Sequence, residues 1–465
     1  MRILVNTTIM IALLCFLTGC GKTPVITPSK NFGFKHMVVI AIDTLAAQNL
    51  HFMGYDRETA PFIDELASQS IVMNKAYTPK ALTLPSFTSF FTAMHPISHN
   101  VMDNGVEIPD QIPSLVMRFQ QSGFYTAGFP AAHMISTHWG CDRGFDFYND
   151  VDGHDADSLL IDADEVQRRV EEFFGNQEDD FDLSDPDTRL FLFVHFFDTH
   201  TDYNPDPQYL QMFADPDYDG PVDGTVGLFG QYNKSEIEFD DADYQHARDL
   251  YDADIRTTDD YVKRLYDYLD SLGILQDTLI VFTADHGENL GEHGYITHGH
   301  PYESGLHVPL FFRFPDDSVK PERIEQLVEI TDLVPTLMEF AGIEQHVPTD
   351  GHSFASLIDS GQFDSSYERE YSLAAGAVNR DEKRDFSITD GEYRYFARIG
   401  RSNKPFVYDI TKDPKEQVDI SDDNPELVSK YAMEMRIQTE WARPAEEPQY
   451  DAETEEMLRS LGYLH

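Results

Sequence analysis

The sequence predicts an α/β fold built on a doubly wound sheet, and two observations carry this prediction. Three continuous apolar runs, at residues 37–42, 190–197 and 278–283, are typical of buried parallel strands. Strands that alternate with helices are characteristic of a doubly wound sheet. Segments with helical periodicity do lie between and around the three runs, at 59–70, 114–122, 163–174 and 243–272.

Aspartates stand at the carboxyl ends of the three predicted strands. Asp43 follows the first run, Asp198 follows the second, and Asp285 comes just after the third. Ligands of doubly wound sheets bind outside the carboxyl ends of the strands. We therefore expect these acidic side chains at the functional edge of the sheet.

The first 20 residues have the features of an export signal. Met1-Arg2 precedes an apolar run over 9–17, and Leu17-Thr18-Gly19-Cys20 resembles the lipobox of prokaryotic lipoproteins, in which the cysteine is acylated. The alternative is an ordinary signal peptide with an incidental cysteine, and a spanning helix is disfavoured because the run is shorter than about 20 residues. We expect an exported lipoprotein of a prokaryotic periplasm or cell surface, anchored to the membrane through Cys20, with residues 21–36 as a tether.

Composition excludes some partners. The chain has 465 residues, with 82 acidic against 34 basic side chains and a formal net charge of −48. Nucleic acids and anionic lipid surfaces are repelled by such a charge, so no nucleic-acid partner is expected. With Cys15 removed and Cys20 acylated, Cys141 is the remaining thiol, and no intrachain disulfide is expected.

The pattern changes near residue 368. Short strand-like pieces follow at 385–389, 393–399 and 406–410, and a helix is predicted over 425–441. These elements indicate a small antiparallel sheet subdomain. We therefore predict a main domain over 37–367 and a C-terminal subdomain with its tail over 368–465.

Several polar motifs occur in a fixed order along the chain. Asp43-Thr44-Leu45 is followed about 40 residues later by the segment 81–87, with the sequence Ala-Leu-Thr-Leu-Pro-Ser-Phe, and about 200 residues further by Asp285-His286-Gly287-Glu288. Supporting segments lie at 54–61, 197–200, 331–337 and 408–414. Together they resemble the sulfatase family of the alkaline phosphatase superfamily over nearly all of residues 37–463. The resemblance implies a large mixed α/β sheet flanked by helices, a small C-terminal antiparallel sheet, and metal-dependent hydrolysis of sulfate or phosphate esters.

The resemblance also assigns candidate site residues. Asp43, Asp285 and His286 match the family's metal ligands, and Thr83 stands at the position of its nucleophile. The structural alternatives are a strand-end cap for Asp43, a helix N-cap for Asp285 and a buried hydrogen-bonded histidine for His286. His200 matches the residue that contacts the substrate anion and protonates the leaving group, although a purely structural histidine is the alternative.

A second ion is also considered. His298 stands where many sulfatases have a lysine, and where two-metal relatives have a metal-binding histidine. With Asp198 it could hold a second ion about 4 Å from the first. We expect calcium or magnesium if there is one ion, and zinc or manganese if there are two.

Thr83 decides the chemistry. The sulfatase motif reads C/S-x-P-S/A-R, and this chain departs from it at Thr83 and at Phe87. Threonine cannot be oxidised to the formylglycine aldehyde, so no formylglycine is expected. Threonine is the nucleophile of two-zinc phosphodiesterases in the same superfamily. Alternatively, Thr83 is only a helix N-cap ahead of Pro85, and the protein is not catalytic.

We therefore predict a metal-dependent ester hydrolase in which Thr83 cleaves a phosphoester or transfers a phosphorylated head group. One alternative is a sulfuric ester hydrolase that acts on sulfated glycans. Another is a non-catalytic, metal-containing glycan-binding protein. In each case the expected partner is a small molecule or glycan that carries a sulfate or phosphate ester.

Overall fold

The structure of the protein, a computed structural model, describes residues 32–151, 159–176, 181–315, 319–359, 367, 369–379, 383–399 and 404–439. Cys20 and the predicted export signal lie outside these residues, so lipidation, export and membrane anchoring stay predictions. The domain boundary at residue 368 also stays a prediction. Within the described ranges, no helix is both long enough and apolar enough to cross a bilayer.

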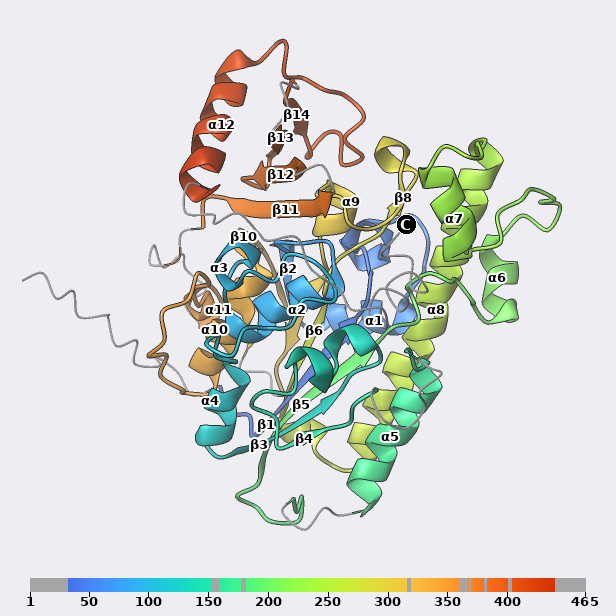
Figure 1. The fold of residues 1–465 in the computed structure, drawn as a ribbon. Coiled ribbons are helices and arrows are strands. Elements are labelled where there is room, and N and C mark those ends of the chain that lie inside the picture. The colour runs from blue at the N-terminus through green and yellow to red at the C-terminus, as the bar shows by residue number, and fades with distance from the viewer. Residues whose placement is uncertain are drawn as a thin grey trace, which may run out of the picture.

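An eight-stranded mixed sheet forms the centre of the molecule (Figure 1). In sheet order its strands are β10 (Glu322–Glu329), β2 (Ile71–Tyr77), β9 (Leu310–Arg313), β6 (Thr278–Ala284), β1 (His36–Ile42), β5 (Arg189–Phe196), β3 (Phe124–Phe129) and β4 (Phe147–Tyr148). Strand β9 runs antiparallel to its neighbours β2 and β6, and the other pairs are parallel. The three predicted strands are β1, β5 and β6, which lie side by side.

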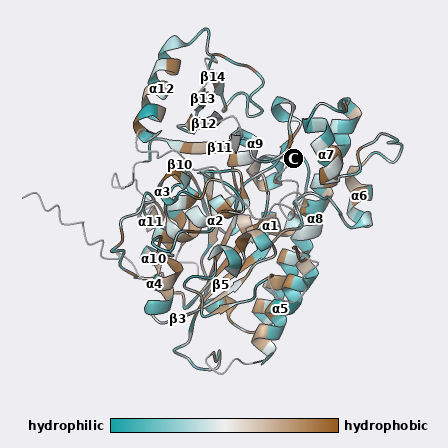
Figure 2. Cartoon of the chain, in the orientation of Figure 1, coloured by the Kyte–Doolittle hydropathy of each residue, from teal (hydrophilic) through white to brown (hydrophobic). Residues whose placement is uncertain are grey.

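Helices cover the sheet on two sides, which explains why the central strands are apolar on both faces. Helix α8 packs with α1 and α5, whereas α10 packs with α2, α4 and α11 (Figure 1). Along α5 and α8, hydrophilic and hydrophobic residues alternate as expected for amphipathic helices that cover a sheet (Figure 2). The α-helices are α1 (Pro61–Ser68), α2 (Thr83–Thr92), α3 (Pro96–His99), α4 (Val116–Gln121), α5 (Ala163–Asn176), α6 (Pro207–Phe213), α7 (Val226–Asn233), α8 (Asp241–Ser271), α9 (Glu303–Leu306), α10 (Leu333–Phe340), α11 (Ala355–Asp359) and α12 (Pro425–Thr439).

Short 3₁₀ turns and one small ribbon complete the main body. The turns are η1 (Ala47–Asn49), η2 (His51–Met53), η3 (His133–Ile135), η4 (Thr137–Trp139), η5 (Leu275–Asp277), η6 (Glu292–Gly294) and η7 (Ile330–Asp332). The ribbon pairs β7 (Asn289–Leu290) with β8 (Ile296–Thr297) in the segment that follows Asp285.

A four-stranded antiparallel sheet follows, as predicted, and α12 packs against it. Its strands are β11 (Ser372–Asn379), β12 (Lys383–Thr389), β13 (Tyr393–Ile399) and β14 (Phe406–Asp409). The buried side chain of Arg394 in β13 forms ion pairs with Glu303 of α9 and with Glu416, and so joins this sheet to the main body.

Candidate active site

The register of the central strands brings two predicted aspartates together. Ile42 at the end of β1 lies opposite Ala284 at the end of β6. Asp43 and Asp285 are the next residues, so both leave the sheet at the same level. Both side chains are buried. Asp43, Asp285 and His286 form a group whose potential ligand atoms all lie within 4.8 Å of one another, as predicted.

Each carboxylate in this group has one oxygen held by the protein and one without a hydrogen-bond partner. Asp285 Oδ1 accepts from the backbone N–H groups of Thr44 at 3.1 Å and His286 at 2.7 Å, and Asp43 Oδ2 lies 3.4 Å from Thr83 Oγ1. The other oxygens, Asp43 Oδ1 and Asp285 Oδ2, are buried without a partner. Two orphaned, buried carboxylate oxygens fit a divalent cation, because such atoms are costly to leave unmatched.

His286 supplies the third potential ligand atom. Its Nδ1 lies 3.0 Å from its neighbour's carbonyl oxygen, Gly287 O, so it donates there and Nε2 carries the lone pair. Nε2 lies 3.3 Å from Asp285 Oδ2 and 4.0 Å from Asp43 Oδ1, the two orphaned oxygens. The three atoms therefore converge on one point.

Thr83 faces this group instead of capping a helix. It is the first residue of α2, and the N-cap position belongs to Leu82, which makes no side-chain capping bond. The Thr83 hydroxyl is buried, and its Oγ1 lies 3.4 Å from Asp43 Oδ2 and 3.5 Å from His286 Nε2. The N-cap alternative therefore does not describe the position of this side chain.

Burial and neighbouring carboxylates raise the pKa values of both aspartates. The pKa of Asp285 rises to about 8, because burial and the neighbouring Asp43 carboxylate disfavour its charged form. Burial and the nearby Glu288 raise the pKa of Asp43 well above its ordinary value. A divalent cation would remove this penalty by compensating both charges.

We expect the contribution of Asp285 to the stability of the ion-free protein to fall as pH rises from about 4 to about 8. Folded Asp285 holds its proton up to a pKa of about 8, whereas its ordinary value is 3.8. At Asp285 the folded state thus binds more protons than the unfolded state in this window, and the part of the free energy of unfolding that this residue contributes falls with rising pH. Ion binding displaces that proton, so apparent affinity should rise about tenfold per pH unit for each proton released. Melting temperatures with and without ion should diverge from pH 5 to pH 8; a constant gap would contradict this assignment.

Three further residues lie beside the group. The ring of His298 is 4.6 Å from that of His286 and 4.8 Å from that of His200, measured between centroids. His298 Nδ1 lies 3.4 Å from the buried Glu288 carboxylate, and His200 Nδ1 lies 2.5 Å from Thr201 O. His200 and His298 are therefore next to the candidate ligands, and their roles as proton donor and as ligand of a second ion stay predictions.

Asp198 lies outside the group of Asp43, Asp285 and His286, its Oδ2 is buried without a hydrogen-bond partner, and its role as a ligand of a second ion stays a prediction. Its Oδ1 accepts a hydrogen bond at 3.1 Å from the N–H of Ala163, the first residue of α5. Among the described residues, the group with metal-ligand spacing includes neither Asp198 nor His298. Strand register explains the offset: Ile42 pairs with Phe196, so Asp198 stands one residue beyond the level of Asp43.

The turn after Asp43 is held by Thr199, which lies in one of the motif segments, and by Tyr251, which lies in none. Thr44 has a φ of +52°, which a β-branched residue rarely adopts. The Tyr251 hydroxyl donates to Thr44 O at 2.6 Å and accepts from Ala46 N–H at 2.9 Å. Thr199 Oγ1 donates to Asp43 O. Tyr251 lies in the predicted helical segment 243–272, and spacing alone cannot show a hydroxyl bond to a distant turn.

Gly287 is expected to tolerate no side chain. A Cβ there would lie 2.1 Å from Ser304 O and 3.1 Å from Ala46 Cα, both backbone atoms. Gly287→Ala should therefore cost about 1–3 kcal/mol of stability and weaken ion binding, because it separates the turns that carry Asp43 and His286. Gly227→Ala is the control, since a Cβ at Gly227 meets nothing within 4 Å. Thermal unfolding and calcium titration measure both effects; equal behaviour of the two variants would contradict the close packing.

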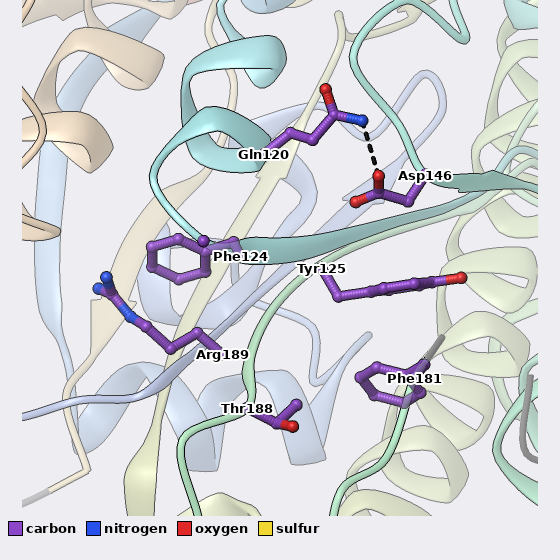
Figure 3. Close-up of a pocket in the computed structure, with 8 residues that line it drawn as sticks. Gln120, Phe124, Tyr125, Asp146, Phe181, Thr188 and Arg189 are labelled. Carbon is purple, nitrogen blue, oxygen red and sulfur yellow. Dashed lines mark hydrogen bonds between the residues drawn. The ribbon is translucent and has the colours of Figure 1, made fainter. Parts of the chain in front are cut away.

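A cavity of about 460 Å³ lies at the opposite ends of the strands from these ligands, next to the amino ends of β3 and β5 (Figure 3). The Arg189 guanidinium lies 3.9 Å from the Phe124 ring centroid there, and Gln120 donates to Asp146 at 2.6 Å. None of the candidate ligands lines this cavity. The candidate active-site residues therefore lie at the carboxyl ends of the strands, as expected for a doubly wound sheet.

A family model described as Sulfatase matches residues 35–343, a span that contains every residue of the site. The chain belongs to the sulfatase family. A second model, described as N-sulphoglucosamine sulphohydrolase, C-terminal, matches residues 291–441. Sulfatase-family proteins are ester hydrolases of the alkaline phosphatase superfamily, so the predicted enzyme class is confirmed.

The named sulfatases that resemble this chain have low sequence identity to it. An arylsulfatase of Clostridium perfringens is 23% identical over 439 residues, covering 82% of this chain and 89% of that protein. An N-acetylglucosamine-6-O-sulfatase of Bacteroides thetaiotaomicron is 22% identical over 466 residues, covering 83% and 82%.

Solved structures confirm the fold of this sulfatase-family chain. One, in complex with its substrate D-glucosamine-2-N,6-O-disulfate, has a TM-score of 0.72 at 19% identity and covers 89% of this chain and 100% of its own. A phosphonate monoester hydrolase of Agrobacterium radiobacter has a TM-score of 0.69 at 19% identity, covering 87% and 96%. The predicted fold class is confirmed.

Proposed function

We propose that this protein is a metal-dependent hydrolase of phosphate-type esters in which Thr83 is the nucleophile. The position of the Thr83 hydroxyl carries the proposal: it is buried, lies 3.4 Å from Asp43 Oδ2 and 3.5 Å from His286 Nε2, and makes no capping bond. An alcohol turned toward candidate metal ligands is placed for attack on a bound ester.

We further propose one ion, held by Asp43, Asp285 and His286. Two carboxylates and one histidine form an oxygen-rich set that suits calcium or magnesium. When bound, such an ion neutralises the anionic ester and lowers the pKa of a nearby alcohol. Asp43 Oδ2 is placed to receive the Thr83 proton, since it lies 3.4 Å from the hydroxyl oxygen.

Threonine favours phosphorus over sulfur as the attacked atom. Attack by Thr83 Oγ1 would form a phosphothreonine and break the bond to the ester oxygen, which leaves with a proton. His200, which is beside the group, is our candidate for supplying that proton, and because its Nδ1–H is donated to Thr201 O it must first take up a proton at Nε2. Water then releases phosphate, or a second alcohol takes up the group. A sulfatase cycle that uses an aldehyde nucleophile cannot begin here, because threonine cannot be converted to formylglycine.

Sulfate ester hydrolysis on glycans is the second candidate. Its support is that relatives across most of the chain are named as sulfatases, including an N-acetylglucosamine-6-O-sulfatase. The phosphonate monoester hydrolase that shares the fold lends comparable support to phosphorus chemistry.

Matched substrates test the proposal. The full-length protein, stripped of ions and refilled with calcium, magnesium, zinc or manganese, is assayed with an aryl sulfate, an aryl phosphate and a diaryl phosphate. We expect phosphoester cleavage that a chelator abolishes and calcium or magnesium restores. Cleavage of the sulfate alone would establish the second candidate. Ion binding without cleavage of any substrate would support the non-catalytic binding protein.

A further inference from the structure

His195 lies directly behind the candidate metal ligands. It belongs to β5 and is fully buried, and its Nε2 is 3.4 Å from Asp43 Oδ2. Its Nδ1 accepts a hydrogen bond from the N–H of Ala131 at 3.3 Å. A neutral imidazole that accepts at Nδ1 carries its proton on Nε2. The proton of His195 is therefore on the nitrogen nearer to Asp43, although the two side chains make no hydrogen bond in this structure.

We propose that His195 is a positioning residue for the divalent ion, acting through Asp43. Its Nε2 makes no hydrogen bond in this structure but lies 3.4 Å from Oδ2, and a bond to that oxygen would leave Oδ1, the orphaned oxygen, to meet Asp285 and His286. Donors behind a ligating carboxylate fix its orientation and commonly contribute tenfold to hundredfold to ion affinity. This inference rests on the ion site in the proposed function, but it does not require turnover.

Phe87 holds the imidazole in place. Its ring meets that of His195 edge to face, with centroids 5.1 Å apart. The Phe193 ring lies parallel to the imidazole on the same strand, at 6.5 Å and 3°. Phe87 is four residues after Thr83 in α2, so the helix that presents the nucleophile also presents the residue that packs against His195.

The same contact gives a physical meaning to the departure from the sulfatase motif at position 87. An arginine there would bring a full positive charge toward His195 and the buried Asp43. Phe87 instead packs against an imidazole that is neutral, because its Nδ1 accepts a hydrogen bond from the N–H of Ala131. A neutral donor orients Asp43 without cancelling its charge, which stays available to the ion.

A matched pair of variants of the full-length protein tests this role. His195→Phe keeps a buried ring but removes the donor, whereas His195→Gln can place an amide N–H near the original Nε2. Calorimetric titration of the stripped protein with calcium, and then with magnesium, zinc and manganese, gives the affinity without any assay of turnover. We expect His195→Phe to bind the preferred ion about 10- to 100-fold more weakly, and His195→Gln to stay within about threefold of the wild type.

Two further variants keep the test decisive if His195→Phe does not fold. Phe87→Leu leaves every polar group in place but loosens the imidazole, and should weaken ion binding several-fold. His99→Gln is the control, because His99 is also buried and bonded to Ser89 but is not in the ligand group; its ion affinity should not change.

The outcomes separate this inference from the proposed function. Wild-type ion affinity in folded His195→Phe, or in Phe87→Leu where the former does not fold, would overturn the role of His195. Tight ion binding by the wild type without hydrolysis of any ester would count against the proposed function alone. Failure of the wild type to bind any of the four ions would remove the ion site, and both proposals with it.

Discussion

Thr83→Ala is expected to abolish ester hydrolysis, with kcat reduced by about 10³-fold or more at saturating ion and substrate. The substitution removes the hydroxyl that lies 3.4 Å from Asp43 Oδ2 and 3.5 Å from His286 Nε2. Asp43, Asp285 and His286 are untouched, so the substrate should still bind while its ester bond stays intact. The measurement is kcat and KM on the ester that the wild type cleaves best.

Two control variants are needed to interpret the effect of Thr83→Ala. Thr83→Ser keeps an alcohol and should retain far more activity than Thr83→Ala. Thr88→Ala removes another buried threonine hydroxyl from α2, one that donates to Leu84 O at 2.7 Å, and should change kcat by less than about threefold. Thr83→Ala activity within tenfold of the wild type would show that the nucleophile lies elsewhere.

Three central strands of the main sheet were predictable because they are buried on both faces. β1, β5 and β6 are continuous apolar runs, and each matches its predicted range to within one residue. β11 was missed, because its sequence, Ser-Leu-Ala-Ala-Gly-Ala-Val-Asn, is rich in alanine and contains glycine. Such residues have low strand propensity, and pairing with β12 is what orders them in a sheet.

The site was predictable where side chains follow strand ends and motifs, as Asp43, Asp285 and His286 do. Residues that support Asp43 or the turn after it gave weaker signals in the sequence. His195 is one polar residue within an apolar strand, and Tyr251 fits the periodicity of a buried helix face. Their hydrogen bonds join segments far apart in the chain, so only the assembled fold reveals them.

The second large effect concerns stability. Arg394→Met is expected to lower the free energy of unfolding by about 3–5 kcal/mol, because it leaves buried carboxylates without their counter-charge. The Arg394 side chain is 1% exposed, and its Nη2 lies 2.5 Å from Glu303 Oε2 while its Nε lies 3.1 Å from Glu416 Oε1. Thermal or urea-induced unfolding measures the loss.

Charge, and not volume, should account for most of this loss, and neutralising the partners separates the two. Glu303→Gln and Glu416→Gln introduced together with Arg394→Met should recover a substantial part of the stability, because no unpaired charge is then buried. Lys263→Met is the exposed control: it breaks a surface pair with Asp267 and should leave unfolding unchanged.

Arg394→Met should also lower activity. Glu303 begins α9, the helix that follows the segment of His298, and the loss of its ion pair should loosen that segment. An Arg394→Met protein as stable as the wild type would show that the ion cluster does not hold the C-terminal sheet to the main body.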